Sequence, residues 1–201
     1  MLAVCLKVMG KSVEISYPFS MQAYLKKHGT GHAGHSLKVE WDIRELGVMI
    51  QFSVNKRSSR AWYTDPVFDH DWSKNWGLWN KDVVEAFLQL RKTADDFKAP
   101  YLELQISPLN QPFALIIQEP RKIFQAPKVL DFIHEVNVDG KLWTATMKFQ
   151  LPSELQGSLI YGGFFACLDQ EPREFYALEP NPEQNPDFHR PELFLPLNMH
   201  E

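Results

Sequence analysis

The chain has 201 residues, of which 44% are apolar and 23% are charged, so it is not a disordered protein. Its formal net charge of −4 argues against nucleic acid as the main partner, because binding to phosphates needs a basic surface. Two distant cysteines, Cys5 and Cys167, make no disulfide framework, and no CxxC spacing for a metal occurs. No apolar run is long enough for a signal peptide or a membrane span, so we expect a cytoplasmic protein unless an export signal has been removed.

Alternation of apolar and polar residues with a period of two dominates the chain and predicts β-strands. Residues Ser20–His28 could form a short helix, but their alternation favours a strand. Ser36–Asn55 alternates on both sides of a turn at 45–47, which predicts two antiparallel strands. Residues 55–78 lose the alternation and have little to bury, so we expect a binding loop or lid that is the most mobile part of the chain.

Two strands with clear faces follow this loop. Asp82–Leu90 and Tyr101–Ser107 each place one set of side chains toward a core and the other set away from it. The residues predicted to be buried are Val84, Ala86, Leu88, Leu102, Leu104 and Ile106. The residues predicted to point away from the core are Glu85, Tyr101, Glu103 and Gln105.

The remaining elements complete an all-β chain. Further strands are predicted at Gln111–Gln118, Ile133–Val138, Leu142–Leu151, Ser158–Leu168 and Leu193–Leu197. Asp139-Gly140 between two of them is the strongest hairpin signal in the chain, and the proline-rich tail is expected to be extended. Eight to eleven short strands predict an antiparallel β-sandwich, of jelly-roll or immunoglobulin-like type, in one domain spanning residues 1–201.

The outward faces of the two strands after the loop carry the residues of interest. Glu85, Glu103 and Gln105 share one surface, with Trp76 and Trp79 at its rim. Aromatic faces stack on sugar rings, and carboxylates and amides accept hydrogen bonds from sugar hydroxyls. The simpler interpretation is that the tryptophans cover the core and that Glu85 is a solvated strand residue, because antiparallel sheets routinely have one polar face.

Four segments together resemble family nine carbohydrate-binding modules and their DOMON-like relatives, in order and spacing, over about residues 36–197. The matching segments are Leu78–Leu88 (LWNKDVVEAFL), Tyr101–Pro108 (YLELQISP), Phe175–Leu178 (FYAL) and Asn185–Pro191 (NPDFHRP). The resemblance is to stand-alone bacterial members of this group and implies a β-sandwich that binds a sugar-like ligand without cleaving it.

The resemblance also implies which residues bind the ligand. In sugar-binding members two aromatic rings sandwich a terminal sugar, and a strand glutamate takes its hydroxyls. By position these residues are Trp79, Tyr176 and Glu85, with Glu103 and Gln105 contributed by the next strand. Tyr176 stands where members commonly have tryptophan, and Glu103 with Gln105 stands where they have a basic residue and an amide.

Other chemistries remain open at this stage. Glu85 and Glu103 on adjacent strands are close enough for the acid/base pair of a glycoside hydrolase. A DOMON-type module binds haem through Met and His side chains, for which Met49, Met147 and His134 are available although no CxxCH motif is present. We expect a non-catalytic binding module first, a haem module second and an enzyme third.

Metal sites have weaker support in the sequence. Three histidines in a glycine-rich loop, His28, His32 and His35, offer imidazoles for a transition metal, but no acid or cysteine completes the set locally, and a solvated loop is favoured. An acidic stretch could hold a structural Ca²⁺ but lacks the spacing of an EF-hand; it contains Asp65, Asp69, His70 and Asp71. His189 is expected to fix the last turn by hydrogen bonds rather than to bind metal. We therefore expect no cofactor, and no nucleic-acid or membrane partner.

Overall fold

The computed structural model describes residues 3–8, 11–16, 21–44, 47–57, 59–69, 71–128, 130, 132–153, 155, 157–183 and 185–197. The side chains of residues 3–16 and of Trp72 lie outside this description. Within the described residues every strand pairing is antiparallel, and the helical segments are three single turns of 3-10 helix. These turns are η1 (Trp72–Lys74), η2 (Leu78–Asn80) and η3 (Pro191–Leu193).

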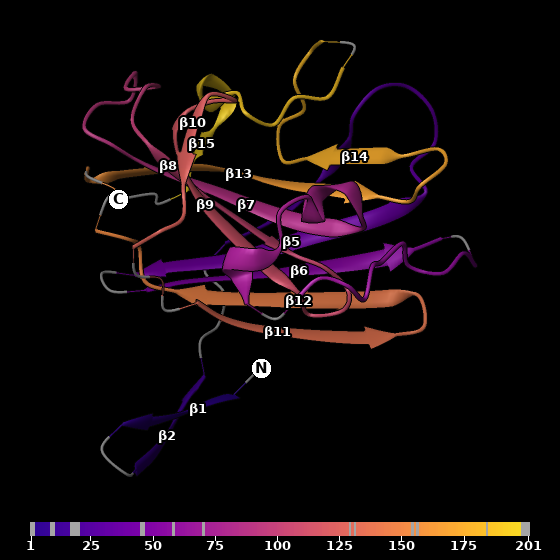
Figure 1. Ribbon diagram of the computed structural model, residues 1–201, viewed down its shortest axis with the longest axis horizontal. Coiled ribbons are helices and arrows are strands. Elements are labelled where there is room, and N and C mark those ends of the chain that lie inside the picture. Colours follow the sequence, from indigo (N-terminus) through magenta and orange to yellow (C-terminus); the bar gives the residue numbers. More distant parts are fainter. Residues whose placement is uncertain are drawn as a thin grey trace.

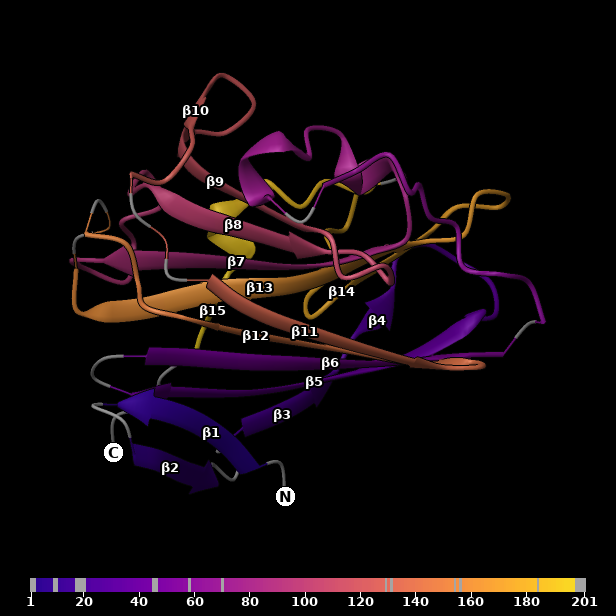
Figure 2. The same ribbon diagram turned by 60° about the horizontal axis from the view of Figure 1, so that its bottom comes forward.

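Two large sheets lie face to face as layers, as Figures 1 and 2 show. The five-stranded sheet has the order β11-β12-β6-β5-β3. Its strands are β3 (Met21–Tyr24), β5 (His35–Arg44), β6 (Gly47–Lys56), β11 (Phe132–Asp139) and β12 (Leu142–Phe149). This arrangement confirms the predicted antiparallel β-sandwich.

The second sheet has eight strands, in the order β10-β9-β8-β7-β13-β14-β4, with β15 also paired to β13. Its strands are β4 (Lys26–Lys27), β7 (Val83–Arg91), β8 (Tyr101–Ile106), β9 (Pro112–Glu119), β10 (Ile123–Gln125), β13 (Leu159–Leu168), β14 (Glu174–Ala177) and β15 (Leu195–Pro196). A separate hairpin of β1 (Ala3–Val8) and β2 (Lys11–Ser16) pairs with neither sheet.

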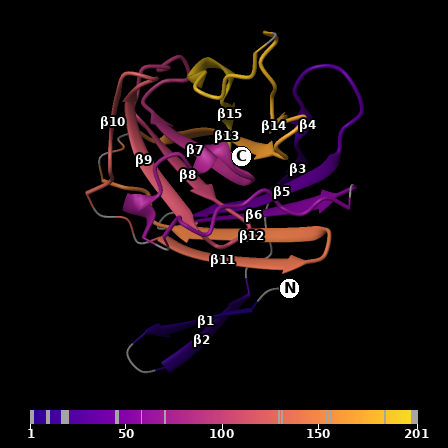
Figure 3. The same ribbon diagram turned by 45° about the vertical axis from the view of Figure 1, so that its right-hand side comes forward.

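In the segment predicted over 20–28, the described residues form strands at 21–24 and 26–27, as the alternation favoured, and these two strands belong to different sheets. β3 lies at the edge of the five-stranded sheet and β4 at the edge of the eight-stranded sheet, and the buried Leu25 separates them. Figure 3 shows this crossing, in indigo, near the end of β14. The chain thus closes one side of the sandwich by changing sheets at a single residue.

The side-chain parity predicted for β7 and β8 is confirmed. All six residues predicted to be buried belong to the apolar core between the two sheets. The opposite face of the eight-stranded sheet is, however, not solvated as expected of a polar face. A second apolar cluster covers it, formed with the loop between β6 and β7 and with the C-terminal segment. The sheet is therefore buried on both of its faces.

The loop between β6 and β7 is held onto this outer face by polar contacts. Asn75 is fully buried and donates its side-chain Nδ2 to the Pro112 carbonyl at 2.6 Å. Leu78 is also fully buried, so the expectation that this loop has little to bury was wrong. Its mobility stays a prediction.

The C-terminal segment pairs with β13 beside two consecutive glycines, and its Leu197 packs into the core between the sheets. β15 pairs with β13 at Gly162. A Cβ atom at Gly162 would overlap the Phe87 carbonyl oxygen and lie 2.6 Å from Leu197 Cδ1. Any larger residue here would push the C-terminal segment off the sheet.

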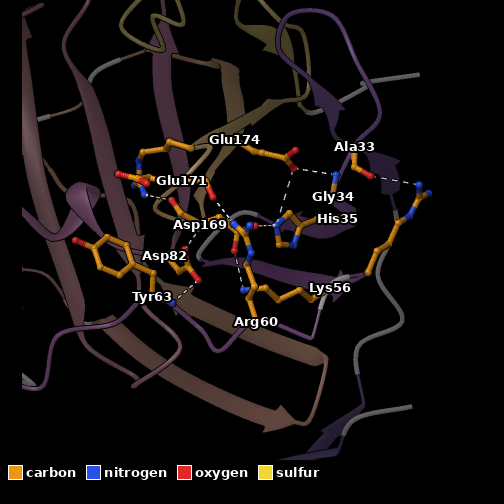
Figure 4. Close-up of polar contacts among 12 residues, drawn as sticks. Ala33, Gly34, His35, Lys56, Arg60, Tyr63, Asp82, Asp169, Glu171 and Glu174 are labelled. Carbon is orange, nitrogen blue, oxygen red and sulfur yellow. Dashed lines mark hydrogen bonds and ion pairs between the residues drawn. The ribbon is translucent and has the colours of Figure 1, made fainter.

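A polar network joins the two sheets at one end of the sandwich, as Figure 4 shows. Lys56 Nζ contacts Asp169 Oδ1 at 2.7 Å, and His35 Nε2 contacts Asp169 Oδ2 at 3.0 Å. Burial alone would raise the pKa of Asp169, but hydrogen bonds from Lys56 and His35 hold it below its usual value. His35 is buried, so the solvated histidine loop expected for it was wrong.

The same aspartate extends the network to the loop. The backbone N–H of Asp169 donates to Asp82 Oδ1 at 2.6 Å, and Asp82 Oδ2 accepts from the Tyr63 backbone N–H at 2.7 Å. Asp169 thereby connects the five-stranded sheet, the turn after β13 and the loop that precedes β7. Loss of its buried partner Lys56 should therefore destabilise all three of these parts of the structure.

We expect Lys56→Met to lower the free energy of unfolding by about 3 kcal/mol, because it leaves the Asp169 carboxylate without its cation. Lys38→Met is the matched control, since Lys38 pairs with Glu40 on the exposed side of the same sheet and should cost at most about 1 kcal/mol. Urea denaturation of both variants measures the difference. Equal effects would show that the buried pair is not important for stability.

The glycine requirement in β13 is tested separately. Gly162→Ala should destabilise the fold by about 2 kcal/mol, because the added methyl meets the Phe87 backbone and Leu197. Gly47→Ala is the control, since its nearest atom to a new Cβ is the Phe149 carbonyl oxygen at 3.9 Å. Thermal melting followed by circular dichroism distinguishes the two, and a neutral Gly162→Ala would contradict the tight packing.

Candidate functional site

A pocket of about 450 Å³ opens on the outer face of the eight-stranded sheet, on the side away from the core. Its floor consists of side chains from β7, β8, β9 and β13 that point outward between those of the second apolar cluster. The floor residues are Glu85, Glu103, Gln105, Leu115, Ile117 and Cys167. A volume of this size is typical of small-molecule sites in proteins.

Aromatic rings line the pocket from both edges of the sheet. Near the β10 edge, Trp76 contacts Trp79 with ring centroids 5.0 Å apart and Phe124 with centroids 5.1 Å apart. Near the β14 edge, Phe175 and Phe188 contact each other with centroids 6.2 Å apart. Trp76 is 56% exposed, so a wide aromatic surface faces solvent at the mouth of the pocket.

The polar floor is rich in hydrogen-bond acceptors. Glu85 on β7 lies directly opposite Gln105 on β8 in the strand register. Gln105 Nε2 donates to Glu103 Oε1 at 2.6 Å, and the buried Gln105 Oε1 has no protein partner. Cys167 Sγ is 3.9 Å from Glu85 Oε1, which is a weak contact. The floor therefore contains one buried amide oxygen, that of Gln105, without a protein donor.

Both glutamates on the floor are almost fully buried, Glu85 being 3% and Glu103 4% exposed. Burial raises the pKa of Glu85 well above its usual value, and the neighbouring charge of Glu103 raises it further, whereas Arg173 lowers it. Burial likewise raises the pKa of Glu103 to about 7. Protonated carboxyl groups are thus favoured on the floor below about pH 7.

His189 belongs to the pocket wall and is bonded as a neutral ring. Its Nδ1 is 2.7 Å from the Tyr101 hydroxyl, which donates to it. Burial, with a smaller contribution from Arg121, lowers the pKa of His189 to about 4. His189 Nε2 then carries the proton and lies 4.0 Å from Glu103 Oε2, which is too far for a direct hydrogen bond. The expected hydrogen bonding of His189 is present, with Tyr101 as its main partner.

Hydrogen bonds from Arg173 connect the backbone of Trp79, in the aromatic wall, to the eight-stranded sheet. Its guanidinium donates to the Asp169 carbonyl at 2.8 Å, to the Trp79 carbonyl at 2.6 Å and to the Lys81 carbonyl at 2.8 Å. Trp79 is therefore positioned by the turn between β13 and β14. The position of this ring depends on the network of Asp169 described above.

The structure brings four of the five sequence-derived candidates to one pocket. Trp79, Glu85, Glu103 and Gln105 all line it. Tyr176 does not, because it pairs with Ala166 and belongs to the core between the sheets. Its hydroxyl donates to Glu174 and accepts from the His35 backbone N–H at 3.0 Å.

The ring that reaches the pocket from β14 is Phe175, which pairs with Cys167 on the outward face of β13. The family motif indicated the next residue, Tyr176. Neighbouring residues of a strand point to opposite faces of the sheet, so Tyr176 points into the core when Phe175 points into the pocket. Other pocket residues that the sequence reasoning missed include Arg121, Phe124, Arg173 and Phe188. The pairing of Phe175 with Cys167 is a contact between strands that the nearly uniform apolar run of Ser158–Leu168 does not reveal, and no local pattern marks the two arginines.

The alternative sites are dispersed in the structure. His28 contacts Asn181 Oδ1 at 2.9 Å, whereas His35 is buried against Asp169. Met147 lies in the core, and His134 contacts Asn110 Oδ1 at 2.9 Å. Across the described part of the chain, no three His, Cys, Asp or Glu side chains are grouped as metal ligands; His70 lies outside it. The structural Ca²⁺ stays untested. Among the described residues no helix is long and apolar enough to cross a membrane.

Comparison with known proteins gives relatives of two kinds. No protein-family model matches the chain. The chain is 30% identical over 131 residues to the UPF0462 protein C4orf33 homolog of Rattus norvegicus, and 27% identical over 128 residues to that of Mus musculus. Each match covers 61% of this chain, and the chain spans 61% and 63% of the lengths of the two relatives. These curated relatives are mammalian, so the bacterial origin implied by the motifs is not supported.

The solved structures that are similar share the fold at low identity. A protein from Bacteroides uniformis that is assigned as carbohydrate-binding aligns with a TM-score of 0.60, at 16% identity, over 87% of this chain and 84% of its own. A family nine carbohydrate-binding module from Caldicellulosiruptor kristjanssonii, solved with glucose, aligns with a TM-score of 0.53, at 14% identity, over 85% and 81%. The same kind of module solved with cellotriose gives 0.54, at 15% identity, over 85% and 78%. The chain therefore has the β-sandwich fold of these carbohydrate-binding proteins.

The buried glutamates predict how stability depends on pH. A carboxyl group whose pKa is raised on folding binds more protons in the folded state, so stability falls as pH rises from about 4.5 through about 7. Glu103→Gln should remove roughly 3 kcal/mol of this decline, since the amide does not ionise. Denaturant unfolding at a series of pH values measures it. Glu135→Gln, on the exposed edge strand β11, should keep the decline of the unmodified protein.

Proposed function

We propose that the pocket on the eight-stranded sheet binds a carbohydrate and does not cleave it. The observation that carries the proposal is the combination of aromatic rings at both edges of the floor with buried oxygen acceptors between them. Aromatic rings stack on the apolar faces of sugars, and carboxylate and amide oxygens accept from hydroxyl groups.

The fold comparisons support this proposal. Three solved structures share this sandwich: one is of a protein assigned as carbohydrate-binding, and two are of family nine modules with glucose or cellotriose bound. Fold alone does not determine function, so the argument depends on the residues of this pocket. Trp79, Glu85, Glu103 and Gln105 lie where both the motifs and the strand parity predicted a ligand.

The protonation of the floor argues against glycoside hydrolysis. Hydrolysis by two carboxyl groups needs one ionised group to act as nucleophile or base and one protonated group to act as acid. Burial raises the pKa of both Glu85 and Glu103, so below about pH 7 both are mostly protonated and the ionised group that hydrolysis needs is scarce. We therefore expect the pocket to bind and not to cleave.

Trp79→Ala should remove most of the binding, because the indole contributes both contact area and shape. Glu85→Gln should weaken binding less and leave the fold intact, since the amide keeps an acceptor. Titration calorimetry against a panel of mono- and oligosaccharides is the test, with an expected Kd of roughly micromolar to millimolar. No heat with any sugar, or equal binding by Trp79→Ala, would reject the site. Incubation with oligosaccharides should release no new reducing ends.

The two neighbouring rings of β14 provide a matched pair of variants. Phe175→Ala should weaken sugar binding by about tenfold, because Phe175 lines the pocket. Tyr176→Phe should leave binding unchanged and lower the free energy of unfolding by about 1 kcal/mol, because the lost hydroxyl bonds Glu174 and the His35 backbone. The opposite result for the two variants would mean that the ligand contacts the other face of the strand.

A further inference from the structure

The floor of the pocket has more buried acceptors than the protein supplies with donors. Within the described residues neither Glu85 nor Glu103 is ion-paired with a lysine or an arginine. Gln105, 1% exposed, leaves its amide oxygen without a partner on the same floor. A buried acceptor left unsatisfied is costly, so these atoms indicate that the occupant brings donors.

The cations nearest to the floor have other partners. Arg173 donates to three backbone carbonyl groups, and Arg121 pairs with Asp187 at the rim. His189 is a neutral ring that accepts from Tyr101. Neither floor glutamate therefore has a direct ion pair with a lysine or arginine of the described residues, and the charge of Arg173 acts on Glu85 only from a distance, lowering its pKa.

We propose that the preferred ligand is an amino sugar, whose protonated amine sits on the floor among Glu85, Glu103 and the free amide oxygen of Gln105. This inference rests on the proposed function, because it names the ligand class for the same pocket. The sugar ring would lie between the aromatic walls, with Trp79 on one side and Phe175 on the other.

An ammonium group fits the floor better than a hydroxyl group does. It has three N–H donors and no acceptor, and the floor offers three side chains that can accept. Hydrogen bonds between a charged donor and a carboxylate are about twice as strong as neutral ones. A neutral sugar would leave the buried carboxyl groups protonated, and each hydroxyl group would donate one hydrogen bond only.

Charge on the ligand and protons on the protein are then linked. The ionisable groups that line the pocket are Glu85, Glu103, Cys167, Asp187, Arg121, Arg173 and His189. Burial raises the pKa values of Glu85, Glu103 and Cys167, and of these three only the glutamates are carboxyl groups, whose ordinary pKa lies below neutral pH. A cation favours the charged form of a nearby carboxyl group, so binding of an amino sugar should release protons from them, whereas a neutral sugar should not.

Titration calorimetry on the full chain with D-glucosamine, D-glucose and N-acetyl-D-glucosamine tests this. At about pH 6 the amine of glucosamine is charged and the floor is largely protonated. Two buffers of different ionisation enthalpy then reveal the proton release. We expect glucosamine to bind about tenfold more tightly than the two neutral sugars, with release of about one proton.

Two variants distinguish the floor from other sites on the protein. Glu103→Gln should abolish the preference for glucosamine and the proton release, and Glu85→Gln provides a second test should the first variant fold poorly. Glu135→Gln, an exposed carboxylate on the other sheet, should behave as the unmodified protein. Thermal melting confirms that each variant is folded.

The outcomes separate the two proposals. Glucose binding as tightly as glucosamine would overturn the amino-sugar inference and support carbohydrate binding in general. A preference for glucosamine that survives both Glu103→Gln and Glu85→Gln would overturn the inference too, because the amine would then lie elsewhere. Binding of none of the three sugars would overturn the inference, and failure of the wider saccharide panel would reject the proposed function itself.

Discussion

The carboxylate of Asp169 is the contact on which the arrangement of both sheets and of the pocket wall depends. It pairs with Lys56 and His35 of the five-stranded sheet, although it belongs to the turn that follows β13 of the other sheet. The backbone carbonyl of Asp169 accepts a hydrogen bond from Arg173, which also donates to the Trp79 carbonyl. A single buried charge thus connects the interior of the sandwich to an aromatic ring on its outer surface. Changes far from the pocket, at Lys56 for example, should alter both stability and ligand affinity.

The second determining feature is that the eight-stranded sheet is buried on both faces. Covering the outer face by a loop and by the C-terminal segment places Glu85 and Glu103 in an environment of low polarity, which is why their pKa values rise. On a bare sheet the same residues would be solvated and ordinary. The candidate function therefore comes from the covering segments as much as from the strands that carry the acids.

The fold and most of the floor could be predicted from the sequence because strand alternation is a local signal. It placed Val84 and Leu104 in the core, and Glu85, Glu103 and Gln105 on the other side. The burial of that other side could not be predicted, since it depends on contacts between segments far apart in the chain, such as Tyr101 with His189. Tyr176 rather than Phe175 was predicted as the aromatic ligand-binding residue of β14, because that prediction followed the family motif and not the direction in which the side chains of the strand point. His35 was misjudged for a related reason: glycine-rich neighbours suggested solvent, whereas its partner lies 134 residues further along.

The C-terminal segment that lies on β13 at Gly162 also has a consequence for the order of folding. Phe188 and His189 belong to the pocket wall, yet they follow every other strand of the two sheets except β15. Until this segment docks, the outer face of the eight-stranded sheet exposes Phe87, Tyr101 and Phe165 to water. A partly folded chain would therefore present a broad aromatic surface, of the kind that associates with other chains. The pocket is complete only when this segment has docked, so the docking that protects the sheet also completes the pocket.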